Sequence, residues 1–335
     1  MSLREQYRKG LKPLVVEEWV DLLLYRPLGF LVALPIFPTP ITPNMVTALS
    51  GLVGLAGAAY MMVGSREALT IGAALYMLSN VLDCTDGQLA RMKNQFSRYG
   101  RIFDGVADYV VGFGTFLALF ISWKPVGYGW TFWAFLVFFG GIVSTTFQGM
   151  HLNHVRLSYL KAIEHDANGK SRPRVSAKER KAAREKRSIY RRLFLLPFYG
   201  LYRFYLSQER GVRRRVRLPQ DLPKSEQKRL SLHMVLILWT FTGKGTHVTI
   251  LALFLLLGRP EQYLWFTLII GNLYVFAVYL VHKLVIRSLN RAKELRSDER
   301  SDSGGRAIDP DGGTHTQSAQ DAARRRRAPD TELDA

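Results

Sequence analysis

Six long apolar runs constrain the fold of this chain more than any other feature. They span about 45–63, 68–90, 104–122, 130–152, 234–257 and 262–286. Each is near the roughly 20 residues that cross a bilayer as an α-helix. A chain that is 48% hydrophobic and carries a net charge of +19 must also keep its apolar and basic residues in separate stretches. We therefore expect an all-α integral membrane protein with six transmembrane helices.

Basic residues are concentrated on one side of this predicted topology. Residues 161–230, between the fourth and fifth runs, hold 21 Lys and Arg against 7 Asp and Glu. The connection after the second run adds Arg91, Lys93, Arg98 and Arg101. The short loops of the opposite side contain only Arg66, Lys124 and Arg259. Because Lys and Arg accumulate in cytoplasmic loops, we expect a multi-pass protein of the cell membrane whose two termini face the cytoplasm.

The chain divides into five parts. We expect an N-terminal cytoplasmic and interfacial segment, four transmembrane helices, a basic cytoplasmic insert, two more transmembrane helices and a disordered tail, over 1–40, 41–160, 161–232, 233–290 and 291–335. Residues 13–30 place Glu17, Glu18 and Asp21 beside apolar residues, which predicts an amphipathic helix in the interface before a proline-rich bend. From Ser297 onward there are almost no apolar residues to bury.

The basic insert indicates a membrane surface as its partner. Its aromatic-rich patch, Leu193–Tyr205, suits anionic lipid headgroups. Nucleic-acid binding is the competing interpretation. We do not favour it, because a basic cytoplasmic loop is already expected from topology and no base-reading module is recognisable. The single cysteine, Cys84, excludes an internal disulfide and a cysteine zinc site.

Four aspartates lie where the second run ends and the third begins. Asp83 and Asp86 share one helical face, Asp104 and Asp108 share another, and a turn near 92–99 would fold the two faces together. Four carboxylates in a poorly solvated place repel one another unless a cation binds them. Oxygen ligands favour hard ions, so the sequence predicts a site for magnesium, manganese or calcium that a pyrophosphate could complete.

Small and basic residues accompany the first aspartate pair. Gly87 and Ala90 leave room for a ligand to approach the helix, and Arg91 offers a positive fork to a phosphate. Small residues also let membrane helices pack closely, so this second explanation of Gly87 and Ala90 stays open.

These residues together resemble a known family signature. The signature of the class I CDP-alcohol phosphatidyltransferases is matched at every fixed position by Asp83-x2-Asp86-Gly87-x2-Ala90-Arg91-x8-Gly100-x3-Asp104-x3-Asp108. The resemblance covers roughly residues 40–160 and 233–288 and does not account for the insert. It implies an enzyme of phospholipid synthesis that has a six-helix fold and often forms a homodimer.

The resemblance also implies roles for the signature residues. Asp83, Asp86 and Asp104 would hold one or two Mg²⁺ or Mn²⁺ ions, with Asp108 close to them and acting as the general base on the acceptor hydroxyl. The donor would be CDP-diacylglycerol, and CMP would leave. By the same resemblance Gly87 and Ala90 would border the cytidine and Arg91 would contact its phosphates, and we place Gly100 in the same CDP-binding group. The active site would face the cytoplasm.

The acceptor is less well defined by the sequence. Polar residues that could contact it on the cytoplasmic half are His151, Asn153, His154, Arg156, Thr242, Lys244 and His247. They could equally reach the membrane interface from helix ends. The run Gly243-Lys244-Gly245-Thr246 is not a nucleotide phosphate loop, because the glycine that opens such a loop is missing.

Two other functions remain open at this point. The signature is shared by enzymes that transfer from CDP-choline or CDP-ethanolamine to diacylglycerol, so the motif does not separate the two directions. A cation transporter is the non-enzymatic alternative. Against it, the carboxylates gather at one face beside Arg91, and no second polar site continues a path.

Overall fold

The computed structural model of the protein describes residues 2–95, 98–123, 132–168 and 226–304. Every regular element among them is helical. The chain forms two compact units, Met1–Arg287 and Ser288–Ala335, and the described part of the second unit is the end of the last helix. All contacts discussed below belong to the first unit.

Six helical stretches of the described residues are long and apolar enough to cross a membrane, which confirms the predicted number of spans. They are Pro43–Val63, Arg66–Met92, Phe103–Ser122, Phe132–Leu160, Leu230–Leu256 and Pro260–Leu289. Which side faces the cytoplasm stays a prediction.

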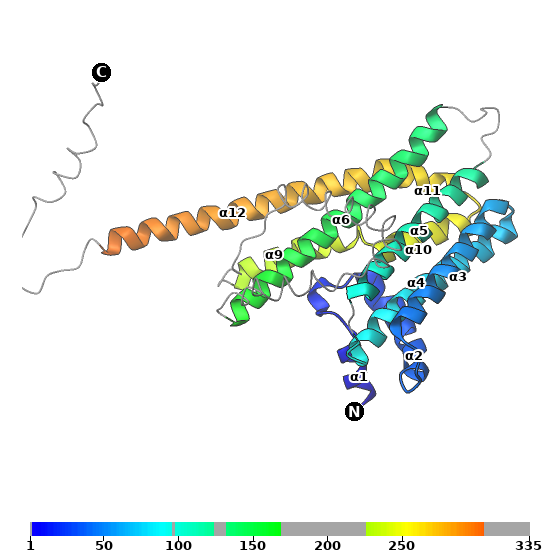
Figure 1. The fold of residues 1–335 in the computed structure, drawn as a ribbon. Helices are drawn as coiled ribbons and strands as arrows, with labels where there is room; N and C mark the ends of the chain where they lie inside the picture. Colours follow the sequence, from blue (N-terminus) through cyan, green and yellow to red (C-terminus); the bar gives the residue numbers. More distant parts are fainter. Residues whose placement is uncertain (1, 96–97, 124–131, 169–225, 305–335) are drawn as a thin grey trace, which may run out of the picture. The chain divides into compact units, whose positions relative to one another are not determined.

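The helices that form these spans are labelled in Figure 1. They are α3 Pro43–Val63, α4 Arg66–Met92, α5 Arg98–Ser122, α6 Phe132–Asn168, α9 Glu226–Thr240, α10 Lys244–Leu256, α11 Pro260–Phe266 and α12 Asn272–Gly304. A π-helical turn, Thr267–Gly271, joins α11 to α12. The fifth span is interrupted, because α9 ends at Thr240 and α10 starts again at Lys244.

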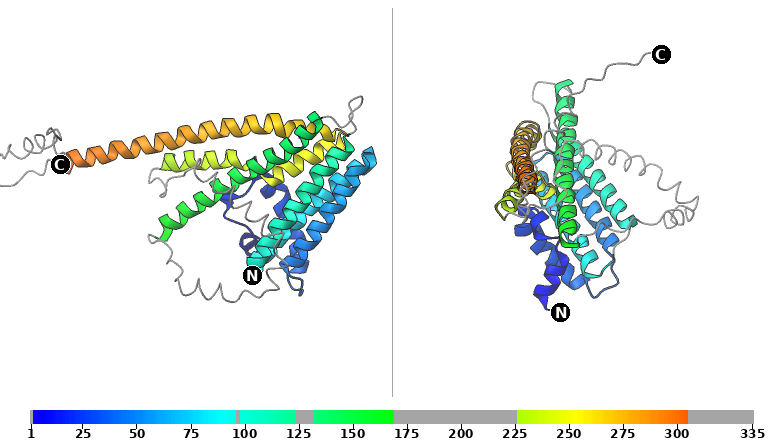
Figure 2. Two further views of the ribbon diagram at one scale, coloured as in Figure 1. Left: turned by 45° about the horizontal axis from the view of Figure 1, so that its top comes forward. Right: turned by 90° about the vertical axis from the view of Figure 1, so that its left-hand side faces the viewer.

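Helices α3 and α4 form a tight antiparallel pair, visible side by side in Figures 1 and 2. Gly64 closes α3 in the left-handed conformation with φ of 73°, and Ser65 caps α4 by accepting a hydrogen bond from the Ala68 amide. The pair crosses at two glycines. A Cβ on Gly72 would lie 3.0 Å from the Gly57 carbonyl oxygen and 2.7 Å from Cγ of Met61. The crossing therefore requires glycine at position 72.

The N-terminal segment differs from the predicted single helix over 13–30. It forms α1 (Leu3–Gly10), a 3₁₀ turn (Leu14–Val16), a π-helical turn (Asp21–Tyr25) and α2 (Arg26–Ile36), which contains Pro35. The chain bends at Glu17 because Glu17 and Glu18 are buried instead of lying on a polar face. Glu17 pairs with the buried Arg26 at 3.1 Å.

This segment packs on α4 close to the aspartates. Gln88 donates from Nε2 to the Arg26 carbonyl oxygen at 3.0 Å, and Thr85 donates from Oγ1 to the Gly29 carbonyl oxygen at 3.2 Å. A Cβ on Gly29 would lie 2.8 Å from Gln88 Oε1, so α2 approaches α4 very closely. The N-terminal segment is thus part of the folded core and not only a surface anchor.

Asp21 is an unusual member of this segment. Its Oδ1 is buried and has no hydrogen-bond partner among the described residues. Burial, reinforced by the negative charge of Glu18, raises the pKa of the Asp21 carboxyl to about 7.

The insert and the tail are described only at their edges. Helix α6 continues to Asn168, so the first residues of the insert are helical. The patch Leu193–Tyr205 lies outside the described residues, as do residues 305–335. Helix α12 reaches Gly304, so the described part of the predicted tail over 291–335 is helical.

Replacing Gly72 with alanine should destabilise the protein by about 1–3 kcal/mol, because the new methyl group meets the Gly57 carbonyl at the α3–α4 crossing. Thermal unfolding in detergent measures the effect. Gly149→Ala is the matched control, since a Cβ on that helical glycine meets nothing within 4 Å. Equal melting temperatures of the two variants would contradict the close crossing.

Asp21→Asn should gain stability relative to the wild type as the pH rises from 5 to 8. The folded state keeps a proton on Asp21 up to pH about 7, whereas the unfolded chain releases it near pH 3.8. The wild type therefore becomes less stable as the pH rises through this range. The variant does not lose this stability, because its amide does not ionise. The difference in melting temperature between variant and wild type should grow with pH, while Glu67→Gln, at an exposed position, should show no such trend.

Candidate metal and catalytic centre

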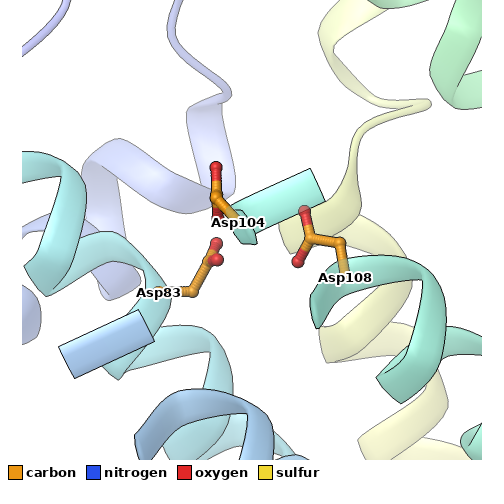
Figure 3. A group of neighbouring side chains, drawn as sticks. All are labelled: Asp83, Asp104 and Asp108. Atoms are coloured by element: carbon orange, nitrogen blue, oxygen red, sulfur yellow. The ribbon is translucent and has the colours of Figure 1, made fainter. Parts of the chain in front are cut away.

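Helices α4 and α5 bring three carboxylates together. Asp83 of α4 and Asp104 and Asp108 of α5 each offer one oxygen, and these oxygens all lie within 4.8 Å of one another. Figure 3 shows the three side chains pointing toward a common centre. The geometry follows from the helical hairpin, because α4 ends at Met92 and α5 begins at Arg98, as the predicted turn near 92–99 requires.

The fourth aspartate lies beside these three with a protein partner of its own. Asp86 is buried, and its Oδ2 accepts a hydrogen bond from Oγ1 of Thr47 in α3 at 2.5 Å. Sequence reasoning did not find Thr47. Its place one turn after the Thr42-Pro43-Asn44 entry to α3 is the signal that could have pointed to it.

The three clustered carboxylates fit a divalent cation. All donors are oxygens, and they come from helices that fix their backbones. Three like charges this close at membrane depth repel strongly, so the cluster requires positive charge. Oxygen-only ligands are those that Mg²⁺ and Mn²⁺ prefer. Asp83, Asp104 and Asp108 could therefore hold such an ion, with Asp86 on the adjoining turn of α4.

A lysine also reaches the cluster. Lys244, the first residue of α10, places Nζ 3.0 Å from Asp83 Oδ2 and 2.5 Å from Asp108 Oδ1. Of the residues predicted to contact the acceptor, Lys244 is the one that the described contacts bring to the carboxylates.

A small pocket adjoins the carboxylates. It is lined by Asp83, Asp108 and Lys244 together with Tyr76, Asn80 and Ser50. Its volume of about 20 Å³ is enough for one water molecule and too small for a polar headgroup. The Asp108 side chain is 43% exposed, so a substrate hydroxyl could reach its carboxylate.

The other predicted acceptor residues have partners in helix packing. His151 stacks on Trp239, with ring centroids 5.7 Å apart, and bonds through Nδ1 to the Phe147 carbonyl. The remaining pairings are His247 with Gln148 and Tyr263, Arg156 with Glu18, and Thr242 with the Trp239 carbonyl, while His154 is buried and Asn153 half-buried on α6. Their roles toward an acceptor stay predictions.

The residues predicted to bind CDP lie on α4 and at the start of α5. Arg91 donates from Nε to the Gly10 carbonyl oxygen at 2.5 Å, so the N-terminal segment holds its guanidinium. Its Nη2 is buried without a hydrogen-bond partner among the described residues, which leaves a donor for a phosphate. A Cβ on Gly87 would lie 3.3 Å from this nitrogen. Ala90 precedes Arg91 on α4, and Gly100 lies in the first turn of α5.

The part of the chain that carries the carboxylates is similar to known proteins. Residues 40–172 match the sequence profile of the family described as CDP-alcohol phosphatidyltransferase. The matched segment contains all eight signature positions, from Asp83 to Asp108.

Two characterised relatives show similarity over about a third of the chain. A CDP-diacylglycerol–serine O-phosphatidyltransferase of Helicobacter pylori is 36% identical over 114 residues, which is 32% of this chain and 46% of that protein. A bifunctional IPC transferase and DIPP synthase of Thermococcus kodakarensis is 34% identical over 104 residues, which is 31% of this chain and 23% of that protein.

The chain thus spans less than half the length of these curated relatives. The profile match covers the helices that carry the carboxylates, and both relatives have names of transferases or synthases. Residues 40–172, which include the convergent aspartates, are thus similar to the CDP-alcohol phosphatidyltransferase family.

Proposed function

We propose that this protein transfers the phosphatidyl group of CDP-diacylglycerol to the hydroxyl of a polar headgroup acceptor and releases CMP. The observation that carries the proposal is the convergence of Asp83, Asp104 and Asp108 within 4.8 Å, at the meeting point of α4 and α5. The family match supports the type of reaction.

The carboxylates would have two roles in this reaction, metal binding and proton transfer. Asp83, Asp86 and Asp104 would hold one or two Mg²⁺ or Mn²⁺ ions, which when bound neutralise negative charge on the pyrophosphate of the donor. Asp83 and Asp104 reach the cluster directly, and Asp86 is held in place by Thr47.

Asp108 is the best candidate for the general base. Its carboxylate belongs to the cluster and is 43% exposed, so it can take the proton of an acceptor hydroxyl that approaches from the open side. The deprotonated oxygen would then attack the phosphorus attached to diacylglycerol, and CMP would depart with the bonding electrons of the broken P–O bond.

The donor phosphates would lie next to Arg91. This side chain keeps a buried, unpartnered nitrogen, and the Gly10 carbonyl fixes its other edge. A guanidinium held in this way can bind a phosphate without first losing its rotamer freedom. Gly87, Ala90 and Gly100 would leave space for the nucleotide around it.

The name of one relative supports the proposed direction of transfer. The name of the Helicobacter protein includes CDP-diacylglycerol and serine. We therefore propose a CDP-diacylglycerol donor rather than CDP-choline or CDP-ethanolamine, and an acceptor such as an inositol phosphate, glycerol phosphate or serine. Lys244 is the residue best placed to contact the acceptor, with His151, His154, Arg156 and His247 as further candidates.

The membrane setting completes the proposal. The six spans and the basic insert suit a multi-pass enzyme with its active site toward the cytoplasm and its basic surface on anionic lipid. A homodimer is proposed on the resemblance alone.

The purified protein in detergent should release CMP from CDP-diacylglycerol in the presence of Mg²⁺ and one acceptor. Inositol 1-phosphate, glycerol 3-phosphate, serine, inositol and choline are tested separately, and the lipid product is identified by mass. Release from CDP-choline with diacylglycerol instead would reverse the donor assignment. If no CDP compound reacts or binds, the enzyme proposal fails and cation transport has to be reconsidered.

Asp108→Asn should lower turnover by about 10²- to 10⁴-fold, the usual contribution of a general base, while keeping most Mn²⁺ binding. Asp104→Asn should instead weaken Mn²⁺ binding by about tenfold or more, because it removes a direct ligand. Turnover and Mn²⁺ titration followed by electron paramagnetic resonance separate the two effects. Equal, mild losses in both variants would contradict the division of roles.

A further inference from the structure

Of the run Gly243-Lys244-Gly245, only Lys244 has a role in the site described so far. It lies where the fifth span is interrupted, between the end of α9 at Thr240 and the start of α10 at Lys244. The break places the N-terminus of α10 inside the membrane-spanning part of the chain. Helix ends of this kind leave backbone N–H groups that need a partner.

The partner comes from the N-terminal segment. The Gly245 amide donates to Oε2 of Glu18 at 3.0 Å, and Arg156 of α6 donates to Oε1 of the same carboxylate at 3.2 Å. Glu18 is only 4% exposed. Its buried carboxylate therefore joins the N-terminal segment to α6 and α10. A carboxylate at a helix N-terminus is also favoured by the helix dipole.

The two glycines make this contact possible. A Cβ on Gly243 would collide with the carboxyl group of Glu18, and a Cβ on Gly245 would collide with Oδ1 of Asp21. Any other residue at either position would push the N-terminal segment away from the first turn of α10. The residue between them, Lys244, is therefore held by its neighbours on both sides.

Lys244 in turn occupies the carboxylate cluster. Its ammonium group bonds Asp108 and Asp83, two of the three residues whose oxygens converge. A divalent ion at the same place needs the Asp83 oxygen, and the ammonium group would be repelled by that ion. The Lys244 side chain is 42% exposed, so its flexible stem can swing out of the cluster.

We propose that Lys244 is a built-in counter-cation of Asp83 and Asp108 that a divalent metal ion must displace, and that Glu18 is the residue that positions it. The inference rests on the proposed metal-dependent function. Metal binding then does two things at once: it exchanges one cation for another on Asp83, and it frees the Asp108 oxygen that would accept the acceptor's proton. Lys244 keeps the cluster neutralised in part when no metal is bound.

Mn²⁺ affinity tests the inference without any turnover. The full-length protein in detergent is titrated with MnCl₂ at constant pH, and free Mn²⁺ is followed by electron paramagnetic resonance. Lys244→Met and Lys244→Gln should each bind Mn²⁺ about tenfold more tightly than the wild type, because a competing charge has been removed. Lys244→Arg, which keeps the charge, should bind about as weakly as the wild type.

Lys283→Met is the matched control. It removes one lysine from an exposed position of α12, so it changes the net charge equally and should leave Mn²⁺ affinity unchanged. Thermal unfolding of each variant is recorded in parallel.

Glu18 is tested by a double-mutant cycle. Glu18→Gln should tighten Mn²⁺ binding by a smaller factor than Lys244→Met, because Lys244 is then held less firmly in the cluster. In a Lys244→Met background the same change should have no further effect. A purely structural role of Glu18 would lower the melting temperature and leave Mn²⁺ affinity unchanged.

The outcomes separate the inference from the function on which it rests. Mn²⁺ binding of equal or lower strength in Lys244→Met and Lys244→Gln overturns the counter-cation role, while the metal site stands. Additive effects of Glu18→Gln and Lys244→Met overturn the positioning role. If neither the wild type nor any Lys244 variant binds Mn²⁺, the proposed metal site fails and the inference with it.

Discussion

The repulsion between carboxylates gathered at membrane depth is the constraint on which the rest of this structure depends. Asp83, Asp104 and Asp108 converge because α4 and α5 form a hairpin. Their negative charges then have to be balanced by positive charge from other groups. Within the described residues the fold supplies Lys244 at a break in the fifth span. A divalent ion can supply the rest. The same repulsion would favour the binding of a divalent ion by the cluster.

A second layer of buried polar contacts supports this cluster from the N-terminal side. Glu17 pairs with Arg26, Glu18 joins the first turn of α10 to α6, and the Gly10 carbonyl holds Arg91. A buried charge is costly unless it is paired, so these contacts specify one arrangement of the segment against the membrane helices. The N-terminal residues thereby touch both the metal-binding and the phosphate-binding ends of the proposed site.

The differences between prediction and structure have a common cause. The helix predicted over 13–30 is divided at Glu17. Glu17 pairs with Arg26 within the segment and Glu18 bonds to α6 and α10, and a local pattern of apolar and acidic residues reveals neither contact. The same limit applies to the acceptor residues: His247 and Arg156 have polar side chains suited to a ligand, yet their described partners are Gln148, Tyr263 and Glu18. The type of side chain is visible in a sequence, but its partner is not.

By itself the sequence determined the six spans and the signature from Asp83 to Asp108, since hydropathy and helical periodicity are properties of neighbouring residues. It also indicated that two aspartate-bearing faces meet, because the turn between them is short. Only the tertiary structure decided that Thr47 bonds Asp86, that Lys244 lies between Asp83 and Asp108, and that Glu18 holds α10. These pairs join residues 39 to 227 positions apart, and their contact depends on how whole helices pack rather than on any local pattern.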